Sequence, residues 1–389
     1  MPTKRKVLAL TSLGLLVLAA GSLDAQIPSL SLSQPDAKFP EAFSLIMGLR
    51  EMPDGRVMIA DPLSQTLVLA DMTSGTADTL GGVGGGPGEY RQPDGLLPLP
   101  GDSTLLIDLG NARLTVVAPD GSFAETIPMA RAGPGGRPQI ILPGGVDSQG
   151  RIYFQPFGGG AGGRIPDSST VIRLDRATGA LDTIARVGRP ELKRTTSGSS
   201  GNQQVAIRIV PLSPQDAWAV GPDGRIAAAR AADYHVEWID ASGRVVRGAA
   251  VSYKPVPIKQ ADREEWAAQA GANGLRIEVS IQNGERQMAF SRGGGSGRQA
   301  DTDGLDWPEV KPAFVAQGVW VTPEGEAWVQ RSVPAGEPAV IDVFGPDANL
   351  KRQVVLPAGR QIVGFGRGAV YLIETDEFGL QWLERYRTS

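Results

Sequence analysis

The chain has 389 residues, of which 51 are glycine and 30 proline, and hydrophobic residues make up 41% of it. This composition favours a turn-rich all-β globular protein over a disordered one. The formal net charge of −4 offers no basic surface for nucleic acid, and the lack of cysteine excludes disulfides, thiolate metal sites and cysteine nucleophiles.

The first 25 residues have the parts of a secretory signal peptide. Basic residues at 4–6 precede an apolar run over 7–20, and small residues follow up to Ala25. A membrane anchor would need about 20 apolar residues, and no later stretch is long and apolar enough to span a membrane. We predict cleavage near Ala25 and export to the periplasm or beyond, leaving residues 26–389 as a single domain.

One complete β-unit can be recognised at residues 96–128. Four short β-prone runs, at 96–99, 104–108, 113–117 and 123–128, are separated by turns rich in Gly, Asn, Asp and Pro. This pattern predicts a four-stranded antiparallel meander. One meander cannot bury both of its faces, so copies elsewhere in the chain would indicate a radial array of sheets.

Six copies of the unit occur, each marked by a turn glycine before a β-prone run. The spacings between markers are 46, 49, 74, 101 and 43 residues, so the two long spacings indicate insertions. We predict a six-bladed β-propeller, with seven blades as the alternative if the second insertion forms a sheet. The last copy ends after about three strands, and the alternating run 27–33 is predicted to supply the fourth and close the ring. The markers are Gly55, Gly101, Gly150, Gly224, Gly325 and Gly368.

The segment 86–121, GPGEYRQPDGLLPLPGDSTLLIDLGNARLTVVAPDG, resembles an NHL-type repeat. The whole chain resembles the bacterial exported six-bladed β-propeller proteins that carry such repeats. The resemblance implies a fold and a general binding role, because that superfamily includes both interaction modules and enzymes.

The long loops are predicted to share one face of the propeller. In a meander of strands A to D, the A–B and C–D turns lie at one end and the B–C and D–A loops at the other. All long segments fall at the second end, where long loops are often functional. Within the longest we expect a helix over 258–270, which lays Trp266 onto the rim, and a hairpin of 276–282 with 285–291. The long segments are 81–88, 156–168, 188–210 and 252–312.

Six residues are candidates for ligand binding at that face. Asp61 and Asp108 lie at the ends of the second strands of their blades, and Glu374 lies at the equivalent position in the last blade. Their carboxylates either bind a ligand or accept hydrogen bonds from the backbone amides of their own turns. In the second case Asn111 and Arg113 would join Asp108 in a local network. Other blades have arginine or proline there, so we predict neither a metal nor a cofactor. The candidates are Asp61, Asp108, Arg113, Arg230, Trp307 and Glu374.

The single histidine, His235, limits the catalytic possibilities. A multi-histidine metal site is impossible, and strand alternation places His235 beside Glu237, which favours a structural pair. We therefore predict no catalytic residue.

The main functional prediction is a non-catalytic module that binds a protein, peptide or glycan through the face with the insertions. The alternative is a propeller enzyme, a hydrolase, lactonase or lyase, with Asp61, Asp108 and Glu374 around the channel mouth. Two of these carboxyls within about 5 Å in a polar pocket would favour the enzyme. A third possibility is a structural ring within a larger assembly.

Overall fold

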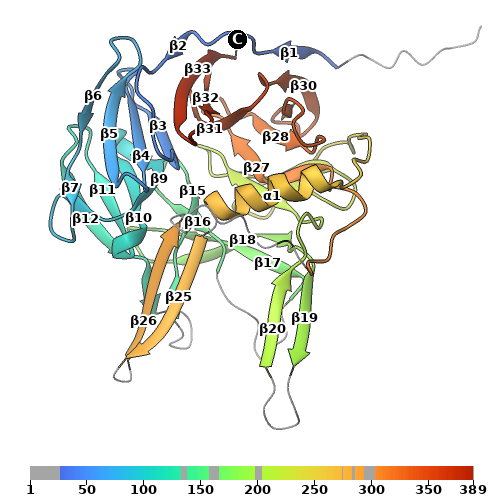
Figure 1. Cartoon of the computed structure of the whole chain (residues 1–389). Coiled ribbons are helices and arrows are strands. Elements are labelled where there is room, and N and C mark those ends of the chain that lie inside the picture. Colours follow the sequence, from blue (N-terminus) through green and yellow to red (C-terminus); the bar gives the residue numbers. More distant parts are fainter. Residues whose placement is uncertain are drawn as a thin grey trace, which may run out of the picture.

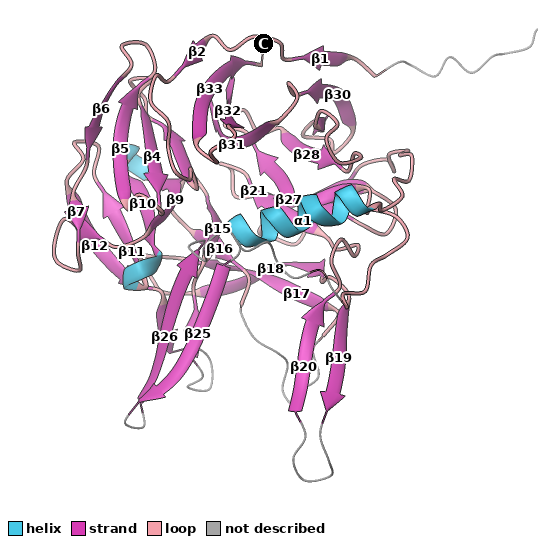
Figure 2. Cartoon of the chain, viewed as in Figure 1, coloured by secondary structure: helices cyan, strands magenta, loops and turns pink. Residues whose placement is uncertain are grey.

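A computed structural model describes residues 27–132, 138–156, 166–197, 204–273, 275–282, 285–292, 302 and 304–388. The chain forms a six-bladed β-propeller, with its sheets arranged in a ring (Figure 1). Strands dominate, and α1 (Gln260–Asn273) is the one α-helix among the described residues (Figure 2). The predicted signal peptide lies outside the described residues.

Blades 1 to 4 are antiparallel sheets whose strands follow chain order. Blade 1 contains β3 (Gly48–Glu51), β4 (Val57–Asp61), β5 (Thr66–Asp71) and β6 (Thr76–Thr79), and blade 2 contains β9 (Pro93–Pro98), β10 (Thr104–Asp108), β11 (Arg113–Val117) and β12 (Phe123–Pro128). Blade 3 contains β15 (Pro143–Val146), β16 (Ile152–Phe154), β17 (Ser168–Leu174) and β18 (Leu181–Gly188), and blade 4 contains β21 (Ala217–Val220), β22 (Ile226–Arg230), β23 (His235–Ile239) and β24 (Val245–Arg247).

Two N-terminal strands complete the last two blades. Blade 5 contains β27 (Phe314–Val321), β28 (Ala327–Arg331), β29 (Val340–Phe344) and β30 (Leu350–Val355), and β1 (Ser29–Ser31) adds a parallel fifth strand. Blade 6 contains β31 (Arg360–Gly366), β32 (Ala369–Thr375) and β33 (Gln381–Arg387), and β2 (Ala37–Lys38) is its fourth strand. Closure by the N-terminal segment is confirmed, but β2 rather than residues 27–33 fills the gap. Leu32, buried between blades 5 and 6, fixes this crossover.

The marker glycines occupy the A–B turns as predicted. All six have positive φ, from 63° at Gly368 to 87° at Gly55, which is the backbone region that glycine enters without steric cost. The core lies between neighbouring blades, where large side chains of the second and third strands meet. Trp238 is 1% exposed, and its Nε1 donates to the Gly345 carbonyl of the next blade at 2.8 Å. Packing between blades therefore holds the ring together.

The insertions form elements of their own. Short strand pairs lie in two of the connections between blades: β7 (Gly82–Val83) with β8 (Glu89–Tyr90), and β13 (Ala130–Ala132) with β14 (Pro138–Ile140). The A–B and B–C turns of blade 2 are the 3-10 turns η1 (Pro100–Asp102) and η2 (Leu109–Asn111). The first long insertion is the hairpin of β19 (Leu192–Ser197) and β20 (Gln204–Ile209). The second contains α1 and the hairpin of β25 (Leu275–Gln282) and β26 (Glu285–Arg292), so the predicted helix and hairpin are confirmed.

The second insertion joins opposite sides of the ring. Asp262 of α1 pairs with the buried Lys311 before blade 5, at 2.6 Å, and accepts the Ala335 amide of blade 5 at 2.9 Å. Phe290 of β26 is 5% exposed in the apolar cluster of blades 2 and 3, and β26 packs on η2. Blades 2 and 5 are opposite in a six-membered ring, so the insertion crosses the face with the B–C loops, as the position of α1 in Figure 1 also shows.

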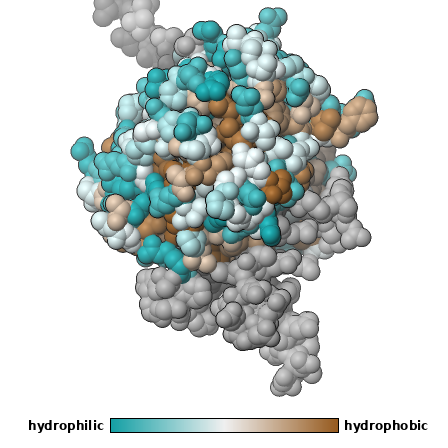
Figure 3. Space-filling view, turned by 90° about the vertical axis from the view of Figure 1, so that its left-hand side faces the viewer, coloured by the Kyte–Doolittle hydropathy of each residue, from teal (hydrophilic) through white to brown (hydrophobic). Residues whose placement is uncertain are grey.

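One side of the ring can be followed in a space-filling view. Figure 3 shows the left side of the Figure 1 view, where hydrophilic residues predominate and apolar residues form small separate areas. No helix among the described residues is long and apolar enough to cross a bilayer.

Candidate functional site

We call the face with the B–C and D–A loops the insertion face, and the face with the A–B and C–D turns the turn face. On the insertion face, Asp61 is 1% exposed and its carboxylate serves the backbone. Oδ2 accepts the amide of Ser44 at 2.7 Å, and Oδ1 accepts the amides of Leu63 and Ser64 at 3.0 and 2.9 Å. This carboxylate fastens a B–C turn to the preceding D–A loop.

Asp108 has the same role in blade 2 and is fully buried. Its Oδ1 accepts the amides of Arg91 and Gln92, at 3.1 and 3.2 Å, and its Oδ2 accepts from Asn111 Nδ2 and Arg113 Nε, at 2.7 and 3.2 Å. The predicted network of Asp108 with Asn111 and Arg113 is therefore present. Arg113 also donates to the Glu89 carbonyl at 2.6 Å, which holds the glycine-rich connection between blades 1 and 2.

Glu374 takes part in a cluster of opposite charges on blade 6. Its carboxylate lies 3.0 Å from Lys38 Nζ and 3.0 Å from Arg360 Nη1, and both cations also contact the buried Glu384. Tyr386 donates to Glu384 at 2.9 Å, and burial together with this carboxylate raises the pKa of Tyr386 to about 12. The cluster joins strands of blade 6 to the N-terminal segment.

Arg230 and His235 belong to a second charged cluster, between blades 3 and 4. Arg230 donates to Glu237 at 2.7 Å, to Asp216 at 2.9 Å and to the Arg186 carbonyl of blade 3 at 2.8 Å. His235 lies buried between Asp233 and Glu237, with ring nitrogens 2.7 and 3.2 Å from their carboxylates. The predicted pairing of His235 with Glu237 is confirmed.

Trp307 packs against the helix of the insertion. Its ring meets Trp266 edge-on at 5.4 Å, and the guanidinium of Arg263 lies 5.4 Å from its centroid. Trp266 therefore packs within the insertion itself, on Trp307. Among the residues that the structure describes, no three histidine, aspartate or glutamate side chains gather as a metal centre requires.

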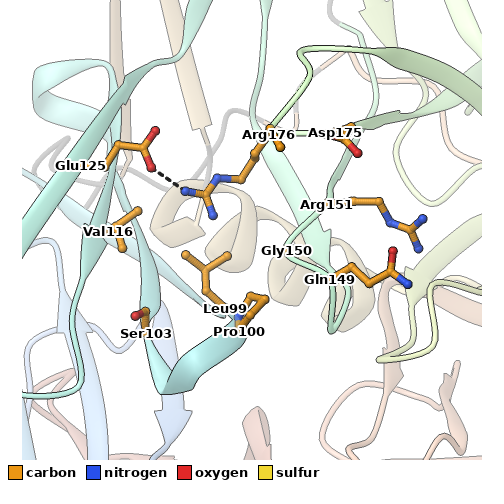
Figure 4. Close-up of a pocket in the computed structure, with 11 residues that line it drawn as sticks. Leu99, Pro100, Ser103, Val116, Glu125, Gln149, Gly150, Arg151, Asp175 and Arg176 are labelled. Carbon is orange, nitrogen blue, oxygen red and sulfur yellow. Dashed lines mark hydrogen bonds and ion pairs between the residues drawn. The ribbon is translucent and has the colours of Figure 1, made fainter.

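A cavity of about 470 Å³ opens between blades 2 and 3, on the turn face (Figure 4). This volume is within the range of small-molecule sites. The A–B turns of both blades and the C–D turn of blade 3 contribute most of its wall. Its lining residues are Leu99, Pro100, Ser103, Val116, Glu125, Gln149, Gly150, Arg151, Asp175, Arg176 and Ala177.

An ion pair bridges the two blades above this cavity. Arg176 Nη2, from blade 3, lies 2.7 Å from Glu125 Oε2, on β12 of blade 2 (Figure 4). The Glu125 side chain is 60% exposed and the Arg176 side chain 21%. Arg176 Nε is buried and has no hydrogen-bond partner within the described parts of the chain. The pair therefore combines a solvent-accessible carboxylate with a guanidinium that has an unused donor.

The opposite wall of the cavity is apolar, and a glycine keeps it open. Leu99 and Val116 project from blade 2 beneath the ion pair (Figure 4). Gly150 has φ of 75°, and a Cβ there would lie 3.1 Å from Pro100 Cδ and 3.7 Å from Arg176 Nη1. A side chain at this turn would crowd both walls.

Neighbouring groups fix the polar wall. The amide and hydroxyl of Thr178 hold the pKa of Asp175 below its ordinary value, which keeps this carboxylate ionised. Arg151 Nε pairs with the buried Asp147 at 2.6 Å. Tyr153 also donates to Asp147, at 2.9 Å, and burial followed by this carboxylate raises the pKa of Tyr153 to about 12.

Sequence reasoning did not identify Glu125 or Arg176. The pair joins residues 51 positions apart on different blades, so no local motif contains both. One signal was available in the repeats. The C–D turn of blade 3 has Arg176 after its aspartate, whereas the matching turns have Met72 after Asp71 and Ala241 after Asp240.

No protein-family model matches the chain, and no curated protein matches it. Solved structures similar to it include a gluconolactonase from Xanthomonas campestris, with 12% identity and a TM-score of 0.41 over 93% of this chain and 96% of that one. Regucalcin from Agrobacterium tumefaciens, a calcium-binding protein, has 11% identity and a TM-score of 0.39 over 93% and 97%. Virginiamycin B lyase from Staphylococcus aureus has 8% identity and a TM-score of 0.35 over 91% and 87%. At these identities the likeness extends to the fold.

The main functional prediction needs correction. Several of the similar structures are named as enzymes, among them a gluconolactonase, a luciferin-regenerating enzyme and a lyase, and the enzyme alternative is taken up under the proposed function. The described cavity also lies on the turn face, whereas the prediction placed binding on the insertion face. The long insertion of the insertion face is bound to the ring at both of its anchored ends.

Proposed function

We propose that the chain is a propeller enzyme, a hydrolase, lactonase or lyase, with its acid–base site in the cavity between blades 2 and 3. The observation that carries the proposal is the exposed Glu125 carboxylate, paired at 2.7 Å with the Arg176 guanidinium, at a cavity of small-molecule size. A base and an electrostatic donor at one cavity are the two elements that carbonyl chemistry requires.

Glu125 is the proton acceptor in this proposal. In a hydrolysis, Glu125 takes a proton from water as the water oxygen bonds to the carbonyl carbon, and returns it to the leaving oxygen when that carbon–oxygen bond breaks. In an elimination, Glu125 takes a proton from the carbon beside the carbonyl, and the leaving group departs from the next carbon with its electron pair. The Arg176 guanidinium carries the positive charge that stabilises the carbonyl oxygen as it becomes negative, and its Nη2 orients Glu125.

The carboxylates of the insertion face are less suited to this chemistry. Asp61 and Asp108 are buried and accept three and two backbone amides respectively. Glu374 contacts two cations that also neutralise Glu384. These three residues stabilise turns and blade contacts, so we transfer the proposed chemistry to the cavity.

The test is a turnover screen that follows two reactions. Proton release reports the hydrolysis of small esters and lactones, and alkene formation reports elimination from β-substituted carbonyl compounds. Glu125→Gln should lower kcat about 100-fold or more, as removal of a general base does. Asp78→Asn, which changes an exposed carboxylate on the outer strand of blade 1, is the matched control and should keep full activity. Equal rates for both variants, with circular dichroism showing intact folds, would refute the assignment of Glu125.

We also propose that the enzyme is exported and that residues 26–389 are its single mature domain. The support is the basic, apolar and small-residue order of positions 1–25 and the NHL-type pattern of residues 86–121. Cell fractionation and N-terminal sequencing test this proposal. An envelope or extracellular protein that begins at Gln26 is expected, and a cytoplasmic protein that retains residues 1–25 would contradict it.

A further inference from the structure

The two walls of the cavity differ in chemistry, and this difference bears on the substrate. On the blade 2 side, Leu99, Pro100 and Val116 present hydrocarbon side chains, with the hydroxyl-bearing Ser103 beside Pro100 in the turn. Leu99 is 7% exposed and belongs to the apolar cluster of blades 2 and 3, and Val116 packs against the same cluster. This wall is thus a continuation of the hydrophobic core that reaches the cavity.

The other wall carries the charges. Glu125 and Arg176 span the gap between the blades, and Asp175 and Gln149 lie on the blade 3 side of the cavity (Figure 4). A bound molecule would therefore meet hydrogen-bonding groups on one side and hydrocarbon on the other. A polyhydroxylated molecule would lose hydrogen bonds to water against the Leu99 and Val116 side without replacement, which is costly.

We infer that the substrate is a small carbonyl compound with an alkyl arm, such as a medium-chain ester or an alkyl-substituted lactone. This inference rests on the proposed function of the cavity. The carbonyl group lies at Glu125 and Arg176, and the alkyl arm covers Leu99 and Val116. Substrate binding then removes apolar surface from water on both partners, and this contribution grows with each methylene group of the arm until the wall is covered.

The experiment is a chain-length series of γ-lactones, from γ-valerolactone upward, with gluconolactone as the polyhydroxylated comparison. Each added methylene contributes about 0.8 kcal/mol when buried, so kcat/KM should rise up to about fourfold per carbon and then level off. Gluconolactone should be the poorer substrate.

The variant Val116→Thr keeps the shape of the side chain but adds a hydroxyl to the apolar wall. It should flatten the dependence of kcat/KM on chain length. Val68→Thr, on the third strand of blade 1, is the control and should leave the series unchanged. Circular dichroism and urea unfolding check that both variants fold.

The outcomes separate the two proposals. Turnover without chain-length dependence, or a preference for gluconolactone, would overturn the alkyl-arm inference and leave the proposed enzyme intact. A chain-length dependence that Val116→Thr does not alter would place the arm elsewhere and also overturn the inference. Absence of any ester, lactone or elimination activity in the wild-type protein would overturn the proposed function, and the inference with it.

Discussion

Removal of the Asp108 carboxylate should destabilise the ring, because four donors converge on it. The variant Asp108→Ala leaves the amides of Arg91 and Gln92, the side-chain amide of Asn111 and the guanidinium of Arg113 without this acceptor. The Asp108 side chain is fully buried and that of Arg113 only 19% exposed, so water replaces the carboxylate poorly. Removing one partner of a buried charge pair costs about 3–5 kcal/mol, and we expect a loss of that size in the free energy of unfolding.

Urea unfolding followed by tryptophan fluorescence measures the effect. Asp120→Ala is the control, because Asp120 is an exposed carboxylate whose contacts are with Ser122 in its own turn. The control should unfold at nearly the wild-type midpoint. A loss below about 1 kcal/mol for Asp108→Ala, or a loss equal to that of the control, would refute the structural role and return Asp108 to the candidate ligand residues.

Three further predictions concern the insertion, the tyrosines and the cavity wall. Phe290→Ala should release β26 from η2 at a local cost of about 3 kcal/mol. Amide hydrogen exchange should therefore accelerate in β25 and β26 but not in the blades. The control Phe378→Ala, at an exposed position, should leave the exchange rates unchanged. The pKa of Tyr153 is raised from 10.0 to about 12 in the folded state, so its contribution to the free energy of unfolding should be present below pH 10 and be lost between pH 10 and 12. In Tyr153→Phe, the free energy of unfolding should decrease less over this pH range. The same decrease in the variant as in the wild type would contradict the assignment. Gly150→Ala and Gly179→Ala should both lose stability because both positions have φ near 75°, and Gly150→Ala should lose more because its Cβ also crowds Pro100. Only Gly150→Ala crowds the cavity and should lose activity, and equal activity of the two variants would contradict the role of Gly150.

The fold was predictable because its repeated turns impose strict local demands. A positive φ at the same point of each blade requires glycine, so Gly55 and its five equivalents recur in the sequence with their spacing intact. Ring closure was only partly predictable. The run 27–33 alternates between apolar and polar residues as a strand does. Which blade it joins depends on the packing of Leu32 into the apolar cluster between blades 5 and 6, which the local sequence does not show.

The site was much less predictable than the fold. The carboxylates at strand ends could be recognised in the sequence. Whether Asp61 or Asp108 contacts a ligand or backbone amides depends on the loop that joins its blade to the preceding blade, and the sequence does not show where that loop lies. The cavity requires Glu125 and Arg176 to meet across a blade interface, and their register is set by packing of whole sheets. Departures from the repeat, such as Arg176 in its turn, are the residues that deserve inspection first in similar chains.

The most direct test of the proposed enzyme is a double-mutant cycle on Glu125 and Arg176. In our account the two residues act as one unit, since Arg176 orients Glu125 and stabilises the charge that Glu125 creates. Each of Glu125→Gln and Arg176→Gln should therefore lower kcat/KM for the best ester or lactone by about 100-fold or more, and the double variant should lose little beyond the larger single loss. Fully additive losses, or wild-type rates in both single variants, would contradict a catalytic pair at this cavity.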